Sequence, residues 1–496
     1  MKNALLTSAL ALAMILGTAG NVFACTGTYV GKKVSANGST IVARTEDIGS
    51  AHPKSVVVYP AQNFPAGSMY ESAITNFKCE NPLFTYKYYA VPDSDGNNDD
   101  GIYDEVGFNE KGVAVSATVS ADVNDAISAI DPLLEDGLRE ADIGTLVLQR
   151  AKTAREGVEE LAKIIDKYGS AEGNIVMIAD HNEAWYMEIL SGHQYVAIKL
   201  PEDKVAVIPN CFMLDYVNLN DKENVIASKN VINLPEKHKL LKYKDGKFSL
   251  RKTYGPERGS YDQDRLWGGY HFLAPSKKLP YNTDFSLFFT PDKKVSVKDV
   301  MELQKYRYEG TELDANLPKN NTDKRKVRPI GIDRQAECHV FELNDKFPKE
   351  APGVLWLTLG NAEHNVYLPY LPVIDKVDPA FSAKSHLFSP EQAYWIFRGQ
   401  GALAEINRDK YGKNVREYWE KYQDNLIKNQ EEVNKNFIEK YKVDKYSAKD
   451  YANKELEKVQ KDSLEKANKM YNELFTYVSG EAGRPHKEAF KPSDMK

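Results

Sequence analysis

The residue best suited to covalent chemistry is Cys25, because the segment before it has the features of a secretory signal peptide. Residues 1–24 carry an early cation at Lys2, an apolar stretch, and the small residue Ala24 directly before Cys25. Cleavage after Ala24 would give Cys25 a free α-amine beside its thiol. An α-amine titrates at about pH 8, so it can take the thiol proton while the thiolate attacks a carbonyl carbon. One residue would then supply both the nucleophile and the base.

Such a site also needs a cation that favours the thiolate, an anion that holds the amine, and donors for the oxyanion. Arg44 and Asp47 are candidates for the first two roles. The strands expected on either side of Asn37-Gly38 would pair as a tight hairpin and bring Arg44 back toward Cys25. A surface ion pair is the alternative interpretation of this R-x-x-D spacing when it is taken alone.

Nine blocks of the sequence, in this order, are typical of one enzyme family. They include the C-T-G start, the run N-G-S-T-I-V-A-R-T-E-D and the run N-E-K-G-V-A-V-S, and they lie at 25–27, 31–33, 37–47, 107–116, 183–188, 191–193, 209–210, 261–267 and 354–357. Together they resemble the secreted PepD-like dipeptidases of the N-terminal nucleophile (Ntn) hydrolase superfamily, relatives of the choloylglycine hydrolases and penicillin V acylases. The resemblance covers the chain from Cys25 to about Arg398.

This resemblance implies an α+β fold, the four-layer αββα sandwich, and hydrolysis of an amide bond through a thioester. It also implies roles for five residues. Cys25 would be the nucleophile and, through its amine, the base. Arg44 and Asp47 would orient and tune it, Asn210 would donate to the oxyanion, and Arg265 would be a second arginine of the site. Dipeptides are the substrates that follow, and no cofactor or metal is expected.

Two other functions stay open at this stage. The bile-salt relatives have a further asparagine on the strand after the N-E-x-G block, where this chain has Thr118-Val119. This departure favours a dipeptidase over an N-acyl amide hydrolase of the choloylglycine or penicillin V acylase type. The other alternative is a lipid-anchored binding protein acylated at Cys25. Ala24 suits a lipoprotein signal, but Phe23 is bulky where a small residue is usual.

The sequence divides into three expected segments. These are a signal peptide at 1–24, a catalytic domain at 25–388, and a helical C-terminal region at 389–496 packed on the core. The C-terminal region is rich in Lys and Glu and has apolar residues at helical spacing. Ser389-Pro390-Glu391-Gln392 predicts a capping box at the start of its first helix.

Within the catalytic segment, strand patterns alternate with a helical one, which favours a layered mixed architecture. A helix is expected over 142–168 and a polar surface loop over 313–334. Strands are expected at 26–31, 39–44, 56–59, 113–119, 174–179, 184–190, 195–199, 204–208 and 354–359.

Charge and hydropathy exclude several partners. Loss of Lys2 with the signal peptide would take the formal net charge from −6 to −7, and no basic face suits nucleic acid. No later segment has the roughly 20 apolar residues of a membrane span. The mature chain is therefore expected in the periplasm or outside the cell, and homo-oligomerisation is left open.

The remaining cysteines and the histidines show no metal-binding pattern. If Cys25 is catalytic, three of the four cysteines remain, and no C-x-x-C pair or H-E-x-x-H spacing is present. The acidic stretch at 93–104 matches a calcium loop only in part, because Asn98 stands where that loop needs Gly. A solvated acidic turn is the favoured interpretation, with calcium binding as the alternative.

Overall fold

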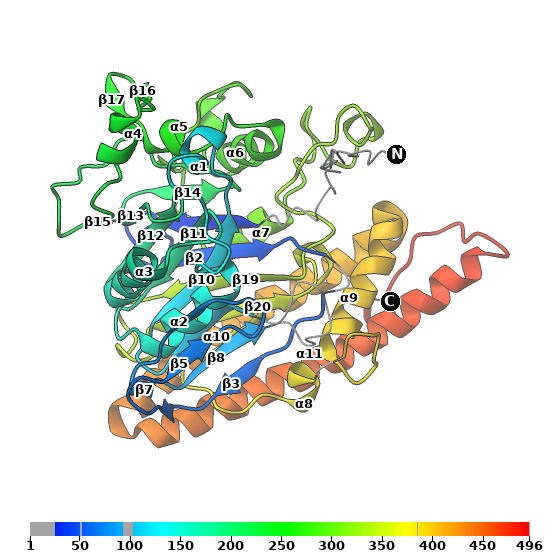
Figure 1. The fold of residues 1–496 in the computed structure, drawn as a ribbon. Coiled ribbons are helices and arrows are strands. Elements are labelled where there is room, and N and C mark those ends of the chain that lie inside the picture. Colours follow the sequence, from blue (N-terminus) through cyan, green and yellow to red (C-terminus); the bar gives the residue numbers. More distant parts are fainter. Residues whose placement is uncertain (1–24, 50–51, 93–102, 384, 496) are drawn as a thin grey trace, which may run out of the picture.

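Two antiparallel β-sheets lie at the centre of the protein, and helices cover their outer faces (Figure 1). The computed structural model describes residues 25–49, 52–92, 103–383 and 385–495. The predicted signal peptide at 1–24 and the acidic residues from 93 to 99 lie outside the described residues. The candidate site is therefore built from Cys25 onward.

The first sheet has seven strands. In spatial order they are β18 (Phe288–Phe289), β14 (Val205–Ile208), β1 (Thr26–Val30), β2 (Thr40–Glu46), β19 (Glu337–Leu343), β20 (Gly353–Leu359) and β21 (Leu368–Tyr370). β1 pairs with β14 on one side and with β2 on the other, where Gly27 lies opposite Arg44. Because β1 is an interior strand, Cys25 directly before it is held by neighbours on both sides.

The second sheet has eight strands. In spatial order they are β15 (Val225–Ala227), β13 (Tyr195–Lys199), β12 (Ala184–Ile189), β11 (Asn174–Ala179), β10 (Ala114–Ser120), β9 (Asp104–Asn109), β8 (Tyr88–Pro92) and β3 (Val57–Tyr59). Strands β9 to β12 follow one another as antiparallel neighbours. Nearly all their side chains are buried, which shows that both faces of this sheet are covered.

The inner faces of the two sheets pack on each other. β2 contacts β10, and the rings of Phe108 on β9 and Phe341 on β19 meet edge to face with centroids 4.8 Å apart. Outside the second sheet lie α2 (Glu140–Arg150) and α3 (Ala154–Tyr168). Outside the first lie α6 (Ser260–Leu273), α7 (Val297–Lys305), α9 (Ala393–Ile406) and α11 (Lys445–Glu481). The predicted αββα order is therefore confirmed.

The link between β1 and β2 differs from the predicted tight hairpin. The strands pair as expected, but the chain between them runs from Gly31 to Ser39. Gly38 has the positive φ of 80° that a turn needs. Asn37 uses its side chain to donate to Glu342 at 2.7 Å and to accept from the Ser39 amide. The Asn-Gly pair thus makes a turn within a longer loop.

The long helix predicted over 142–168 is two helices, α2 and α3. The break follows from Ala151, whose ψ of 136° is extended, and from Thr153, whose side chain accepts a hydrogen bond from the Glu156 amide as the N-cap of α3. Both helices keep an apolar face on the second sheet. The helical spacing seen in the sequence is therefore real, but the capping threonine divides it into two helices.

The C-terminal region is helical, although its predicted start is wrong. Ser389 to Gln392 forms a turn, in which Ser389 Oγ accepts from the Glu391 amide at 3.3 Å, and α9 begins only at Ala393. After α9 come a short π-helix, η4 (Arg408–Gly412), the long helix α10 (Lys413–Val443) and α11, which packs on α9 and α10. The domain boundary expected after residue 388 stays a prediction.

Short elements complete the described chain. The short helices are α1 (Asp125–Ser128), α4 (Asn233–Lys237), α5 (Leu250–Tyr254), α8 (Pro379–Ser382), η1 (Pro275–Lys277), η2 (Pro318–Asn320), η3 (Ala362–His364) and η5 (Ser493–Met495). The two-stranded sheets are β4 (Gln62–Asn63) with β7 (Phe84–Thr85), β5 (Met69–Glu71) with β6 (Lys78–Glu80), and β16 (Tyr243–Lys244) with β17 (Lys247–Phe248). Among the described residues, no helix has the length and apolar character needed to span a membrane.

Candidate active site

Arg44 is in direct contact with the Cys25 thiol. Its Nη1 lies 3.1 Å from Cys25 Sγ and donates to the Thr118 carbonyl oxygen at 2.8 Å. The contact follows from the sheet register, since Arg44 stands opposite Gly27, two residues after Cys25. Thr118 belongs to β10 of the facing sheet, so the guanidinium group joins the two sheets beneath the thiol.

Carboxylates from both sheets surround Arg44. Its Nη2 forms ion pairs with Glu105 of β9 and, at 3.4 Å, with Glu337 of β19, and it lies 4.0 Å from Glu46. Arg44 is 0% exposed, and a buried charge without partners would be strongly destabilising. Although burial alone would lower the pKa of Arg44, Glu105 and the other anions hold it above its usual value. The guanidinium therefore stays charged.

The Cys25 thiol is neutral in this uncleaved chain. It is 1% exposed, and burial raises its pKa well above the usual value. Arg44 opposes that rise, while the carboxylates of Glu105, Glu140 and Asp47 add to it. Arg44 alone is therefore not enough to produce a thiolate, and attack on a carbonyl requires a base that removes the thiol proton.

Asp47 lies directly after β2. Because β1 and β2 are antiparallel, this position is beside the start of β1. One carboxylate oxygen forms an ion pair with Arg328. The other, Oδ1, is buried and has no hydrogen-bond donor within the described part of the chain. No hydrogen bond joins Asp47 to Cys25 among the described residues, so its predicted role as holder of the amine stays a prediction. A free oxygen beside the start of β1 is what that role requires.

The segment 313–334, which was predicted to be a surface loop, is partly buried. The segment is irregular apart from η2, but Arg328 is 4% exposed and Ile330 is 0% exposed. The surface interpretation is therefore wrong for the last part of this segment. The buried charge of Arg328 is balanced by Asp47, and Ile330 belongs to the apolar core.

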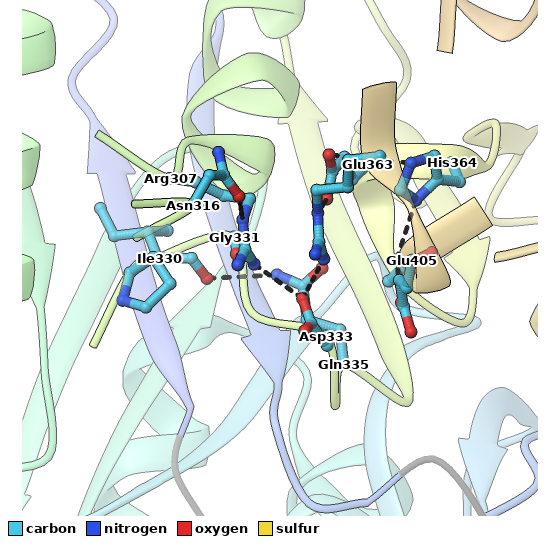
Figure 2. A network of polar contacts seen from close by, with 12 residues as sticks. Arg307, Asn316, Ile330, Gly331, Asp333, Gln335, Glu363, His364 and Glu405 are labelled. Atoms are coloured by element: carbon cyan, nitrogen blue, oxygen red, sulfur yellow. Dashed lines mark hydrogen bonds and ion pairs between the residues drawn. The ribbon is translucent and has the colours of Figure 1, made fainter. Parts of the chain in front are cut away.

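A network of ion pairs fastens this segment to the C-terminal region (Figure 2). Arg307 donates to the Gly331 carbonyl at 2.8 Å and to Asp333 at 2.7 Å. Arg408 of η4 pairs with Asp333 and, at 3.0 Å, with Glu363. The backbone that presents Arg328 to Asp47 is thus held from both sides.

Arg265 contacts both the backbone of Cys25 and the side chain of Asn210. Arg265 of α6 donates through Nη1 to the Cys25 carbonyl oxygen and to Asn210 Oδ1, each at 2.7 Å, and through Nη2 to Asp262 at 2.8 Å. Asn210 in turn donates to the Ser120 carbonyl oxygen at 2.9 Å. Its second amide hydrogen has no acceptor among the described residues. Arg265 therefore fixes the orientation in which Asn210 can donate to an oxyanion.

The other three cysteines, and the histidines His181 and His193, lie away from the Cys25 thiol. Cys79, Cys211 and Cys338 are buried free thiols. His181 contacts the carbonyl oxygens of Asp345 and Phe347, and His193 pairs with Asp131. Within the described residues no group of three or more His, Cys, Asp or Glu side chains is arranged to hold a metal ion.

Comparison with known proteins assigns the class. The family described as Peptidase family C69 matches residues 24–421, and the chain therefore belongs to this family of cysteine-type peptidases. "Probable dipeptidase B" of Streptococcus pyogenes serotype M1 is 41% identical over 404 residues, which are 79% of this chain and 81% of that protein. "Probable dipeptidase" of Latilactobacillus sakei is 33% identical over 394 residues, which are 78% of this chain and 82% of that protein.

A solved structure is similar only at a distance. A variant of the conjugated bile acid hydrolase from Clostridium perfringens covers 73% of this chain and 95% of its own, with 12% identity and a TM-score of 0.29. That likeness is too low to carry an argument about this site.

Several residues at the site escaped the sequence analysis. Glu105, Glu337 and Arg328 lie far from Cys25 in the sequence and have no distinctive spacing. Glu105 lies in β9 and Glu337 in β19, two strands whose residues are nearly all buried. A charge in a buried strand requires a partner of opposite charge.

Proposed function

We propose that this protein is an exported cysteine dipeptidase whose nucleophile is Cys25 at the new N-terminus left by removal of residues 1–24. Membership of the C69 family and the dipeptidase names of its relatives support the substrate class. The observation that carries the proposal is the arrangement around Cys25. Arg44 contacts the thiol, while Asn210, held by Arg265, has an amide hydrogen to donate.

The first half of the reaction forms a thioester. The α-amine of Cys25 takes the thiol proton, and Sγ attacks the carbonyl carbon of the first residue of the dipeptide. Asn210 donates to the oxyanion, with Asp47 accepting a hydrogen bond from the resulting α-ammonium group. The C–N bond then breaks, and the ammonium group returns its proton to the leaving amine.

The second half of the reaction restores the enzyme. A water molecule loses a proton to the α-amine and attacks the thioester carbon, and the C–S bond breaks to release the first amino acid. The thiol regains its proton from the α-ammonium group. Only Cys25 changes its covalent state, and Arg44 stays charged throughout because its anions hold its pKa high.

Hydrolysis of a dipeptide panel by the exported protein tests this function. We expect Cys25→Ser to lose nearly all activity, because a hydroxyl is a far weaker nucleophile than a thiol in the same place. Cys79→Ser is the matched control, since that thiol is also buried but contacts Arg150 instead of Arg44. Full activity in Cys25→Ser would contradict the proposal. Cleavage of N-acyl amides in preference to dipeptides would favour the acylase alternative.

A further inference from the structure

The carboxylate of Glu140 lies at the edge of the site, and the reaction described above gives it no role. Glu140 is the first residue of α2, and its side chain is half-buried. Its Oε2 accepts a hydrogen bond from Ser120 Oγ at 3.2 Å. The carbonyl oxygen of the same Ser120 accepts from the Asn210 side chain at 2.9 Å. One residue of β10 thus joins Glu140 to the expected oxyanion donor.

The carboxyl group of Glu140 lies beside that of Glu105 and has no cation paired with it among the described residues. No Lys, Arg or His side chain in the described part of the chain forms an ion pair with its carboxylate. Its neighbour Glu105 is 1% exposed, pairs with Arg44 through Oε2, and leaves Oε1 without a hydrogen-bond donor among the described residues. Burial raises the pKa of Glu140, as does the nearby Glu172 carboxylate. A cation bound here would contact the carboxylates of both Glu140 and Glu105.

The chemistry of a dipeptide supplies such a cation at the correct position. The α-ammonium group of its first residue is bonded to the carbon that carries the scissile carbonyl. When the carbonyl oxygen lies at Asn210 and its carbon at Cys25 Sγ, the ammonium group lies only a few ångströms from that oxygen. Ser120 holds both Asn210 and Glu140, so an ammonium group on the Ser120 side reaches the Glu140 carboxylate.

We infer that Glu140, with Glu105 behind it, binds the free α-ammonium group of the dipeptide and thereby restricts the enzyme to substrates with an unblocked N-terminus. This inference rests on the proposed function and adds the residue that recognises the substrate amine. Asp47 is left to the α-amine of Cys25, because it lies after β2 and pairs with Arg328. The two amines are therefore held by different carboxylates.

Substitution Glu140→Gln tests the inference, because it keeps the hydrogen bond from Ser120 and removes the charge. We expect KM for free dipeptides to rise at least about 30-fold, since one partner of a partly buried charge pair is lost, while kcat changes much less. Hydrolysis of the same dipeptides with an acetylated amine should be weak in the wild type and unchanged in the variant. The variant should therefore lose most of the preference for free over acetylated substrates.

Glu135→Gln is the matched control, because Glu135 is an exposed carboxylate five residues earlier whose side chain makes no contact with the site. It should keep the wild-type KM. If Glu140→Gln does not fold, Glu140→Asp provides the same test with a shortened carboxylate and an intermediate KM. A wild-type KM in either Glu140 variant, together with an intact preference for free amines, would overturn the inference. Failure of the wild type to cleave any dipeptide would instead overturn the proposed function.

Discussion

Two clusters of buried charge use the same residue types with opposite consequences for their carboxyl groups. Around Glu363, burial would raise the pKa, but His364, Arg408 and other cations hold it at about 2. Around Cys25, burial raises the pKa of Glu105 well above its usual value, and Arg44 offsets only part of that rise. The first cluster has an excess of cations for each carboxylate, whereas the second has a shortage.

The difference distinguishes a structural cluster from a functional one. Glu363 is shared by Arg408 at 3.0 Å and Arg416 at 2.7 Å, so its charge is fully used within the fold. In the second cluster, carboxylate oxygens of Asp47 and Glu105 have no donor among the described residues. The proposed reaction brings two ammonium groups to this cluster, one from Cys25 and one from the substrate. Carboxylate oxygens that the fold leaves without a donor are those that the proposed chemistry uses.

The largest expected effect is on stability, at Glu363. Glu363→Gln would leave Arg408 and Arg416 without their shared anion, and we expect the free energy of unfolding to fall by about 3–5 kcal/mol. Urea denaturation measures this change. Folded molecules should keep activity close to that of the wild type, because Glu363 does not contact the Cys25 cluster. If Glu363→Gln lost activity but kept its stability, the Glu363 cluster would not be a purely structural one.

The next effect is on catalysis, at Asn210. Asn210→Ala removes the oxyanion donor, and kcat for dipeptides should fall about 100- to 1000-fold. Thermal unfolding should change little, because Asn210 is only half-buried. Asn109→Ala is a useful contrast, since the Asn109 side chain donates to the Leu148 and Ala151 carbonyls within the fold. It should lower stability and leave kcat nearly intact.

Glu105→Gln should have the opposite effect to Glu363→Gln, because it should lower activity and have little effect on stability. Because the pKa of Glu105 is raised by burial, loss of its charge should cost less than about 1 kcal/mol of stability. Arg44 would lose a close anion and shift beneath the thiol, so kcat/KM should fall by up to about 100-fold. A large loss of stability with normal activity would place Glu105 among the structural charges.

The pH dependence of stability gives a further test of the Glu363 cluster. A carboxyl group whose pKa is depressed in the folded state stabilises above its unfolded pKa of about 4.3, and this stabilisation is lost as the pH falls toward the folded pKa. For Glu363, with a folded pKa of about 2, the full contribution is about 3 kcal/mol. The stability difference between wild type and Glu363→Gln should therefore narrow between pH 4.5 and about 2. A difference that stays constant with acidification would contradict this account.

Local patterns in the sequence predicted much of the fold. The apolar runs that indicate strands at 174–179 and 195–199 have the observed bounds, because turn residues lie at both ends of each run. Errors arose where a single side chain ended an element. Thr153 divides the predicted helix, and Ser389 forms a turn instead of a helix cap.

Residues of the site could be predicted only where they lie on strands adjacent in the sequence or within a family motif. Arg44 follows from the pairing of two adjacent strands, whereas Asn210 and Arg265 came from family blocks. Glu105 and Arg328 could not be predicted, because their partners come from another sheet and from an irregular segment. Such contacts depend on how layers pack, which hydrophobic spacing does not encode.

The most direct test of the central claim is the intact mass of the exported protein, combined with N-terminal analysis. The account predicts a chain of 472 residues, 24 fewer than the full 496, that begins with an unmodified Cys25. Blocking its free amine should abolish dipeptide hydrolysis. An acylated Cys25, or a chain that is active with residues before Cys25 still attached, would contradict the claim that this residue supplies both nucleophile and base.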